Sequence, residues 1–258
     1  MSHRETQHAT AQSARDASRG RALERPERLM HVAHWRGEAE HAYATLECKV
    51  LRLGDELDRA HRETVRMLIR IAAHRDDESA AHVRRIGLYA AQLAQRMGLD
   101  AGFCSAIAFA AQLHDIGKIG IADRILEKSA PLAGAECKVM KTHCALGAAM
   151  LSHHSSPYLA MAADIARAHH ENWDGSGYPH RLNADAIPLA ARITRLCDSY
   201  DVLRSRRASK LELPHRVAVQ ALLGGDAKVR PRCFDPAVLA AFESSLDAFR
   251  EIFATVRD

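Results

Sequence analysis

Hydrophobic residues recur at helical spacing along most of this 258-residue chain. From residue 79 onward they mark amphipathic stretches that glycine- and proline-containing breakers separate. The stretches cover residues 79–97, 101–115, 134–152, 157–170, 188–204, 213–223 and 236–254. No run of alternating apolar and polar residues bounded by hairpin turns lies between them. The pattern therefore predicts an all-α fold.

A more regular pattern precedes these stretches, over residues 43–74. Apolar or small residues recur there at alternating spacings of four and three, which is a heptad seam. The seam consists of Leu46, Val50, Leu53, Leu57, Ala60, Thr64, Met67 and Ile71. Such a seam is buried either against the helix's own domain or against the same helix of a second copy in a parallel coiled coil. Ala60 and Thr64 weaken it, and we favour a signalling helix that forms a homodimer.

Residues 1–42 have a different composition. They are polar, rich in Ala, Arg, Glu, Ser and His, and have little periodic apolar content. We expect this segment to be mostly disordered or a poorly formed helix. The chain then divides into this segment, the seam helix over 43–74 and a helical domain over 75–258.

The composition suits packed helices, because 47% of the residues are hydrophobic and only 5% are aromatic. The formal charge of +4 tolerates an anionic ligand but does not indicate a nucleic-acid partner. Six cysteines lack C-x-x-C spacing, which argues against a zinc knuckle and against a disulfide framework. Neither a membrane span nor a signal peptide is evident. We therefore expect a soluble cytoplasmic protein.

Two doublets of metal-binding side chains carry the chemistry. His114-Asp115 opens a run that ends at Lys118, and His169-His170 precedes a glycine-containing loop. A single histidine is usually a surface or satisfied core residue. Burying such groups without partners is costly, and two doublets are improbable as independent accidents. They indicate a metal site that performs hydrolytic chemistry.

Five imidazoles and three carboxylates form the candidate ligand set: Glu78, His82, His114, Asp115, His143, His169, His170 and Asp198. One ion would use only part of this set, whereas two or three ions bridged by Asp115 would use it fully. Nitrogen and oxygen donors favour Fe, Mn, Zn, Co or Ni over Ca or Mg. Paired ions can clamp a phosphate and activate a water as hydroxide. Lys118 would supply a positive charge or a proton near the phosphoryl group.

The loop from Asp174 to Pro179 allows two interpretations. Its glycines permit close approach of the backbone, and Pro179 stiffens the exit. The loop is either a turn between helices, with Tyr178 as a packing anchor, or the wall of a pocket. In the second case Tyr178 contacts a base or a partner protein.

In order and spacing, these motifs resemble the HD-GYP subgroup of HD-superfamily phosphohydrolases. The similarity runs from about Arg75 to Phe242. It implies an HD-superfamily helical bundle, preceded here by a long N-terminal helix. It also implies a metal-dependent phosphodiesterase that hydrolyses cyclic di-GMP to pGpG or onward to GMP.

Carried over position by position, the resemblance implies that all eight residues of the candidate set are metal ligands, and we expect two or three divalent ions, Fe or Mn. Asp115 and Lys118 are the expected catalytic residues. For substrate binding we expect Arg207, Lys210, Tyr178, Gly177, Pro179 and Asp174. Ala208-Ser209 stands where the family often has Pro-Tyr, which makes the phosphate contact near Lys210 less certain.

Two other functions remain open at this point. In one, the protein is a signalling scaffold with structural metals, whose Tyr178 loop recruits partners such as GGDEF-type proteins. In the other, the phosphohydrolase acts on another cyclic dinucleotide or on a nucleotide. A panel of substrates, read by product chromatography, separates these from the first hypothesis.

Overall fold

The structure is a computed structural model that describes residues 3–73, 79–128, 130–152, 156–205, 212–225 and 229–257. Within the first of these segments, side chains are described for Met30 and for residues 34–71. The chain divides into two units, residues 1–59 and residues 60–258. The elements are helical, and no β-strand occurs among the described residues. The prediction of an all-α fold is confirmed.

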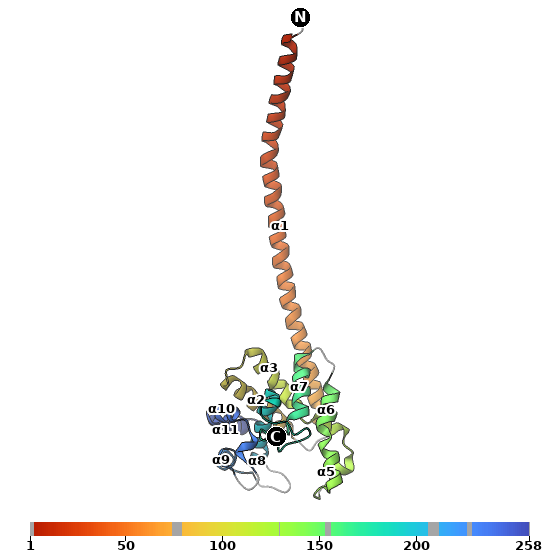
Figure 1. Cartoon of the computed structure of the whole chain (residues 1–258), viewed down its shortest axis with the longest axis vertical. Coiled ribbons are helices and arrows are strands. Elements are labelled where there is room, and N and C mark those ends of the chain that lie inside the picture. The colour runs from red at the N-terminus through yellow and green to blue at the C-terminus, as the bar shows by residue number, and fades with distance from the viewer. Residues whose placement is uncertain are drawn as a thin grey trace. The chain divides into compact units, whose positions relative to one another are not determined.

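The first unit belongs to one helix, α1 (His3–Ala73), which continues into the second unit (Figure 1). The helix begins at His3. Alanine, arginine, glutamate and glutamine favour helix without any apolar periodicity. The expectation that residues 1–42 are mostly disordered or a poorly formed helix stays a prediction. The division into an N-terminal segment, a seam helix and a catalytic domain stays a prediction.

The C-terminal part of α1 packs on the core of the second unit. Val65 is fully buried, and Leu68 and Ile69 are partly buried against the core. His61 makes an edge contact with the ring of Tyr158. This packing fixes the last turns of α1 to the rest of the second unit.

Four helices form the centre of the second unit, and a fifth packs beside them. α2 (Ala80–Arg96) packs on α3 (Ala101–Ala110) and on α8 (Leu189–Arg204). α7 (Pro157–Ala168) packs on α3 and α8, and α6 (His143–Leu151) packs on α7. These helices bury alanine, leucine and isoleucine side chains between them, as the composition indicates.

Three further helices close the core on the side of α2 and α8. They are α9 (His215–Gly224), α10 (Pro236–Glu243) and α11 (Leu246–Thr255). The Tyr89 ring stacks on Phe249 with centroids 4.4 Å apart, and Tyr200 meets the same ring edge-on at 5.1 Å. Short elements complete the unit: η1 (Ala111–Leu113), η2 (Ile116–Gly120), α4 (Asp123–Leu126), α5 (Gly134–Lys141), η3 (Ala184–Ala186) and η4 (Pro231–Cys233).

Two of the predicted stretches are each two helices in the structure. Residues 134–152 divide at Thr142 into α5 and α6, and residues 236–254 divide at Ser244–Ser245 into α10 and α11. Thr142 Oγ1 donates to the carbonyl three residues earlier at 2.6 Å. Ser245 Oγ donates to the carbonyl four residues earlier at 2.8 Å. Such bonds compete with the main-chain helix ladder and favour a bend or a break.

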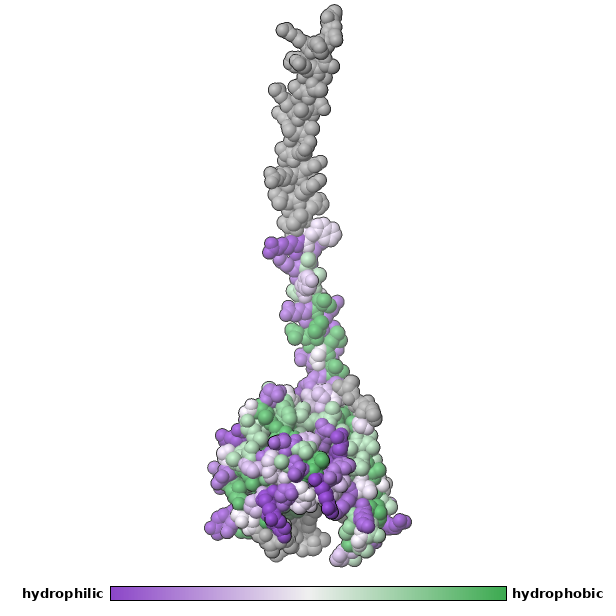
Figure 2. All heavy atoms as spheres, in the orientation of Figure 1, coloured by the Kyte–Doolittle hydropathy of each residue, from purple (hydrophilic) through white to green (hydrophobic). Residues whose placement is uncertain are grey.

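The surface of α1 is unusual in its apolar content. Figure 2 shows hydrophobic side chains gathered along the described part of this helix. Leu46, Val50, Leu53 and Leu57 are each more than half exposed. Within the described part of the chain, no helix combines the length and the hydrophobicity that crossing a bilayer requires.

Candidate metal centre

A sharp turn places Asp115 at the centre of the second unit. α3 ends at Ala110, η1 and η2 follow, and Asp115 lies between these two short 3-10 elements. Leu113 and Ile116 flank the turn and are buried, as predicted, so they anchor it in the core. The side chains of His114 and Asp115 are thereby held inside the helical bundle.

Gly117 allows this turn to reach α6. A Cβ added at Gly117 would overlap the carbonyl oxygen of His143 and the backbone nitrogen of Gly147. Only a residue without a side chain permits this close approach. The glycine of the His114–Lys118 run therefore brings His143 next to Asp115.

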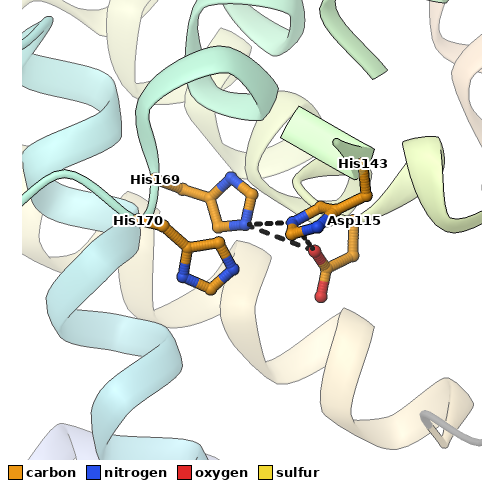
Figure 3. A group of neighbouring side chains, drawn as sticks. All are labelled: Asp115, His143, His169 and His170. Carbon is orange, nitrogen blue, oxygen red and sulfur yellow. Dashed lines mark hydrogen bonds and ion pairs between the residues drawn. The ribbon is translucent and has the colours of Figure 1, made fainter. Parts of the chain in front are cut away.

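One group of candidate ligands surrounds the Oδ1 atom of Asp115 (Figure 3). The group consists of Asp115, His143, His169 and His170, whose donor atoms all lie within 4.8 Å of one another. His143 Nε2 and His169 Nε2 lie 3.1 and 3.2 Å from Asp115 Oδ1. These side chains come from the turn, from the start of α6 and from the C-terminal end of α7.

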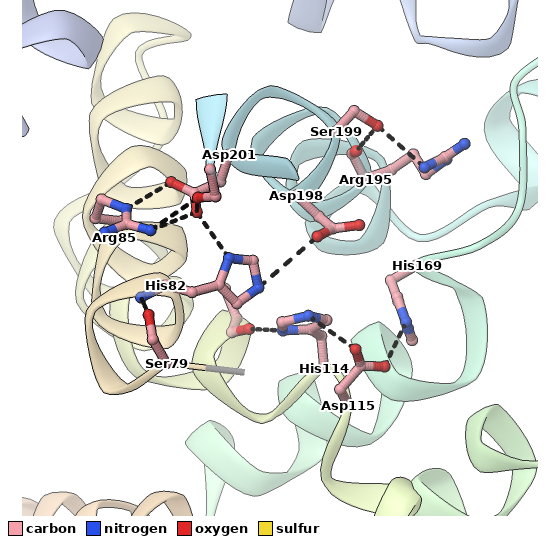
Figure 4. A network of polar contacts seen from close by, with 12 residues as sticks. Ser79, His82, Arg85, His114, Asp115, His169, Arg195, Asp198, Ser199 and Asp201 are labelled. Atoms are coloured by element: carbon pink, nitrogen blue, oxygen red, sulfur yellow. Dashed lines mark hydrogen bonds and ion pairs between the residues drawn. The ribbon is translucent and has the colours of Figure 1, made fainter. Parts of the chain in front are cut away.

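A second group lies on the other side of Asp115 (Figure 4). It consists of His82, His114 and Asp198, again with donor atoms within 4.8 Å of one another. His82 Nε2 is 3.9 Å from Asp198 Oδ1. His114 Nε2 is 3.4 Å from Asp115 Oδ2, so the two oxygens of one carboxylate connect the two groups. The structure thus brings together seven of the eight predicted ligands, and the eighth, Glu78, lies outside the described residues.

The imidazole rings are oriented by contacts at the nitrogen that faces away from the centre. The Nδ1 atoms of His114, His143 and His169 lie 3.0, 2.7 and 3.1 Å from main-chain carbonyl oxygens. Because a carbonyl only accepts, each Nδ1 carries the proton and donates. The Nε2 atoms are then left as electron-pair donors, which is the arrangement found around ligating histidines. The donor set fits a divalent ion of the imidazole-binding class.

The electrostatics of the first group also fit a cation. Burial raises the pKa of Asp115, but His114 and Lys118 outweigh it and hold this pKa well below its usual range. Burial and the neighbouring His169 hold the pKa of His170 well below its usual range, so this ring stays neutral and able to coordinate. For His143, burial lowers the pKa, but the hydrogen bonds to Asp115 and Cys144 and the charge of Asp115 together outweigh burial and raise this pKa to about 10. The ionised Asp115 therefore favours positive charge on its Oδ1 side.

Lys118 lies one turn beyond His114, as predicted. Its Nζ is 2.8 Å from Asp115 Oδ2, and its side chain is 17% exposed. The ammonium group is thus partly open to solvent while it contacts the carboxylate that the two groups share. This position suits contact with an anion that enters the centre.

The glycine-containing loop is tied to the end of α7 by Glu171. The Glu171 carboxylate accepts from the backbone nitrogens of His180 at 2.7 Å and Leu182 at 3.1 Å. A Cβ at Gly177 would overlap the backbone of residues 170–172. The Tyr178–Pro179 peptide bond is cis. The loop therefore folds closely over the His169-His170 doublet.

Tyr178 lies against a candidate ligand. Its ring stacks on that of His170, with centroids 4.6 Å apart, and Lys141 Nζ lies 4.5 Å from the Tyr178 centroid. Asp174 points elsewhere: it accepts from Ser176 and pairs with Arg232 at 3.0 Å. Tyr178 therefore borders the centre, whereas Asp174 braces the loop. The predicted phosphate-contacting residues Arg207 and Lys210 lie outside the described residues.

Sequence reasoning missed two residues beside the centre. Asp201 binds the Nδ1 atom of His82 at 2.8 Å, and its i+3 spacing from Asp198 on α8 was a usable signal. The buried thiol of Cys144 lies 3.5 Å from His143 Nε2. Its only signal was adjacency to a candidate ligand.

Comparison with known proteins decides the family. Residues 66–238 match the family model described as HD domain. This chain belongs to the HD domain family. The resemblance drawn from the motifs is therefore confirmed. The HD domain family binds divalent metal ions, and the two groups around Asp115 have the donors to hold them.

Two relatives and one solved structure extend this result. Over 196 residues the HD domain chain is 37% identical to a cyclic di-GMP phosphodiesterase of Thermotoga maritima, covering 76% of this chain and 52% of that protein. Over 203 residues it is 34% identical to a 3'3'-cGAMP-specific phosphodiesterase 2 of Vibrio cholerae, covering 79% and 38%. A solved HDG"Y"P protein from Bdellovibrio bacteriovorus aligns with a TM-score of 0.50 and 16% identity over 73% of this chain and 62% of that one, which supports the HD fold.

The chain spans about half or less of the length of these two curated relatives.

Proposed function

We propose that this HD domain is a metal-dependent phosphodiesterase that hydrolyses cyclic di-GMP to pGpG, to GMP or to both. The observation that carries the proposal is the carboxylate of Asp115, with the Nε2 atoms of His143 and His169 near its Oδ1 and both His114 and Lys118 near its Oδ2. The similarity to a cyclic di-GMP phosphodiesterase supports the substrate class.

The proposed ligands are the eight residues of the candidate set, with Asp115 as the bridge. When bound, paired ions would lower the pKa of a coordinated water and neutralise charge on a phosphate. Imidazole ligands suit Fe and carboxylate ligands suit Mn, and we propose one of these as the resident metal. Because His82, His114 and Asp198 form a group of their own, we propose a third ion when Glu78 contributes.

The remaining residues act on the phosphate and the base. Lys118 holds positive charge next to the shared carboxylate and is placed to stabilise the charge that develops on the phosphoryl oxygens. Tyr178, Gly177 and Pro179 border His170 and form the proposed wall beside a base. Arg207 and Lys210 are proposed to bind phosphate, and Asp174 contributes by bracing the loop.

The test is hydrolysis by the full chain, purified without air and loaded with Fe or Mn. We expect conversion of cyclic di-GMP, followed by chromatography of pGpG and GMP, and complete loss of turnover in Asp115→Ala with the fold retained by circular dichroism. No hydrolysis of cyclic di-GMP by the loaded protein would overturn the proposal. If 3'3'-cGAMP is cleaved instead, the second substrate candidate, favoured by the similarity to the Vibrio cholerae enzyme, takes its place.

We also propose that α1 forms a parallel homodimer through its heptad seam. The seam positions in the second unit, Ala60, Thr64, Met67 and Ile71, are exposed. The same turns pack on their own domain through the adjacent stripe of His61, Val65 and Leu68. Since the domain covers a different stripe, the seam is available for a second copy of the helix.

A further inference from the structure

The carboxylate of Asp201 is the hub of a buried polar network beside the second group of candidate ligands (Figure 4). Asp201 is fully buried on α8, one turn beyond Asp198. It accepts two hydrogen bonds from Arg85, Nε to Oδ1 at 2.6 Å and Nη2 to Oδ2 at 2.7 Å. It also binds His82 Nδ1 at 2.8 Å and accepts from Ser205 Oγ at 3.0 Å.

Arg85 is itself held in place. Its Nη1 donates to the carbonyl oxygen of Val256 at 3.0 Å, and its guanidinium lies 4.8 Å from the centroid of the Phe253 ring. Bidentate pairs between arginine and carboxylate fix both partners in one geometry. The position of the Asp201 oxygens is therefore determined by α2, α8 and the C-terminal end of α11 together.

The contact at Nδ1 distinguishes His82 from the other oriented rings. Main-chain carbonyls orient His114, His143 and His169, and no substitution can remove a carbonyl. His82 bonds to a carboxylate, which orients a ligating ring and makes it a stronger electron-pair donor.

We propose that Asp201, clamped by Arg85, is a positioning residue that aims His82 Nε2 and sets the metal affinity of the group His82, His114 and Asp198. The affinity of the group around Asp115 Oδ1 does not depend on it, because the rings of His143 and His169 have their own carbonyl partners. The inference rests on the metal centre of the proposed function and requires no particular substrate.

The test is Mn²⁺ binding to the full chain after removal of metal by a chelator, measured by calorimetry and by electron paramagnetic resonance. Two variants assign the binding sites to the two groups. Asp198→Ala should remove the Mn²⁺ sites of its own group with His82 and His114, and His170→Ala should remove those of the group around Asp115 Oδ1. One class of Mn²⁺ sites should be lost in Asp198→Ala. We expect Asp201→Asn to lower the Mn²⁺ affinity of this class about 10–100-fold. The class that His170→Ala removes should keep its affinity.

Asp235→Asn is the matched control. Asp235 is a buried carboxylate that accepts from Arg192 Nη1 at 2.6 Å and from the backbone nitrogen of Ala237 at 2.8 Å. This substitution also removes the charge of a buried carboxylate from an arginine, although Arg192 Nη1 keeps its contact with Asp185 Oδ1 at 3.0 Å. It should lower the unfolding temperature and leave both classes of Mn²⁺ sites unchanged.

A second variant covers the case in which Asp201→Asn does not fold. Arg85→Met combined with Asp201→Asn removes both charges, so that no uncompensated charge is buried. It should fold and show the same selective loss of affinity. Unchanged Mn²⁺ affinity of both classes in the folded variants would show that Asp201 is only structural and would overturn the inference. A wild-type chain that binds Mn²⁺ in two classes but cleaves no cyclic dinucleotide would refute the proposed function alone.

Discussion

The ring orientations in the metal centre are set by the main chain around each histidine. His114, His143 and His169 all bond through Nδ1 to a carbonyl three or four residues earlier. The sequence indicated which side chains could hold a metal ion, because doublets of metal-binding residues are rarely accidental. It did not indicate how the rings turn, since this depends on where each helix ends. The i+3 spacing from Asp198 was a signal for Asp201, but its contact with His82 depends on how α2 packs on α8.

A substitution at Gly117 tests whether the turn at Asp115 must approach the backbone of α6 closely. Gly117→Ala places a Cβ where the carbonyl oxygen of His143 lies, so we expect a loss of about 1–3 kcal/mol in the free energy of unfolding and weaker metal binding. Gly134→Ala is the control, because a Cβ there meets nothing within 4 Å, and its effect should stay within about 0.5 kcal/mol. Denaturant unfolding measures both. Equal effects of the two substitutions would contradict the close-approach argument.

A substitution of Lys118 distinguishes a role in stabilising charge on the phosphate from a role in metal binding. Lys118→Met removes the ammonium group beside Asp115, and we expect kcat/KM for the cyclic dinucleotide to fall about 10²–10³-fold with metal content unchanged. Lys128→Met is a matched control, since Lys128 also pairs with a carboxylate, Glu136, at 2.6 Å but lies apart from the centre. A loss of metal in Lys118→Met would assign the lysine to the assembly of the site rather than to catalysis.

At the scale of elements, helical periodicity located the helices of the second unit but not their breaks. The apolar spacing continues through Thr142 and Ser245, so it does not reveal the helix breaks at these residues. The breaks accompany hydrogen bonds from the two hydroxyl groups to main-chain carbonyls, which a pattern of apolar positions cannot show. The break at Thr142 matters for function, because it makes His143 the first residue of α6. On α1, the sequence left open whether the domain covers the seam, and the structure leaves the seam residues exposed.

The seam of α1 can be tested with two exposed leucines that are close in sequence. Leu53 lies on the seam and is 58% exposed, whereas Leu51 lies off it and is 64% exposed. A charge at a seam position destabilises a coiled coil, so Leu53→Asp should shift the protein from dimer to monomer. Leu51→Asp should leave the dimer intact. Analytical ultracentrifugation over a range of concentrations measures this, and a monomeric wild type would refute the dimer.

At the scale of the whole domain, the centre joins parts of the chain that are far apart in sequence. Its donors come from α2, the turn at Asp115, α6, α7 and α8, which also pack on one another in the core. These helices bury apolar side chains against one another, so we expect hydrophobic burial to assemble them and the ligands to converge as a consequence. The sequence was enough to name the candidate donors. Their division into two groups that share Asp115 could be seen only from how the helices pack.

Metal removal should consequently weaken the domain without unfolding it. An ion that binds only the folded state stabilises it by RT ln(1 + [L]/Kd), which is about 2.7 kcal/mol at a free concentration of 100 times Kd. We expect Mn²⁺ added to chelator-treated protein to raise the unfolding temperature in a concentration-dependent manner, while the apo protein keeps its helical circular dichroism signal. Asp115→Ala removes the shared carboxylate and should abolish most of this shift. An apo protein without helical signal would mean that metal, rather than the buried apolar core, holds α2, α6, α7 and α8 together.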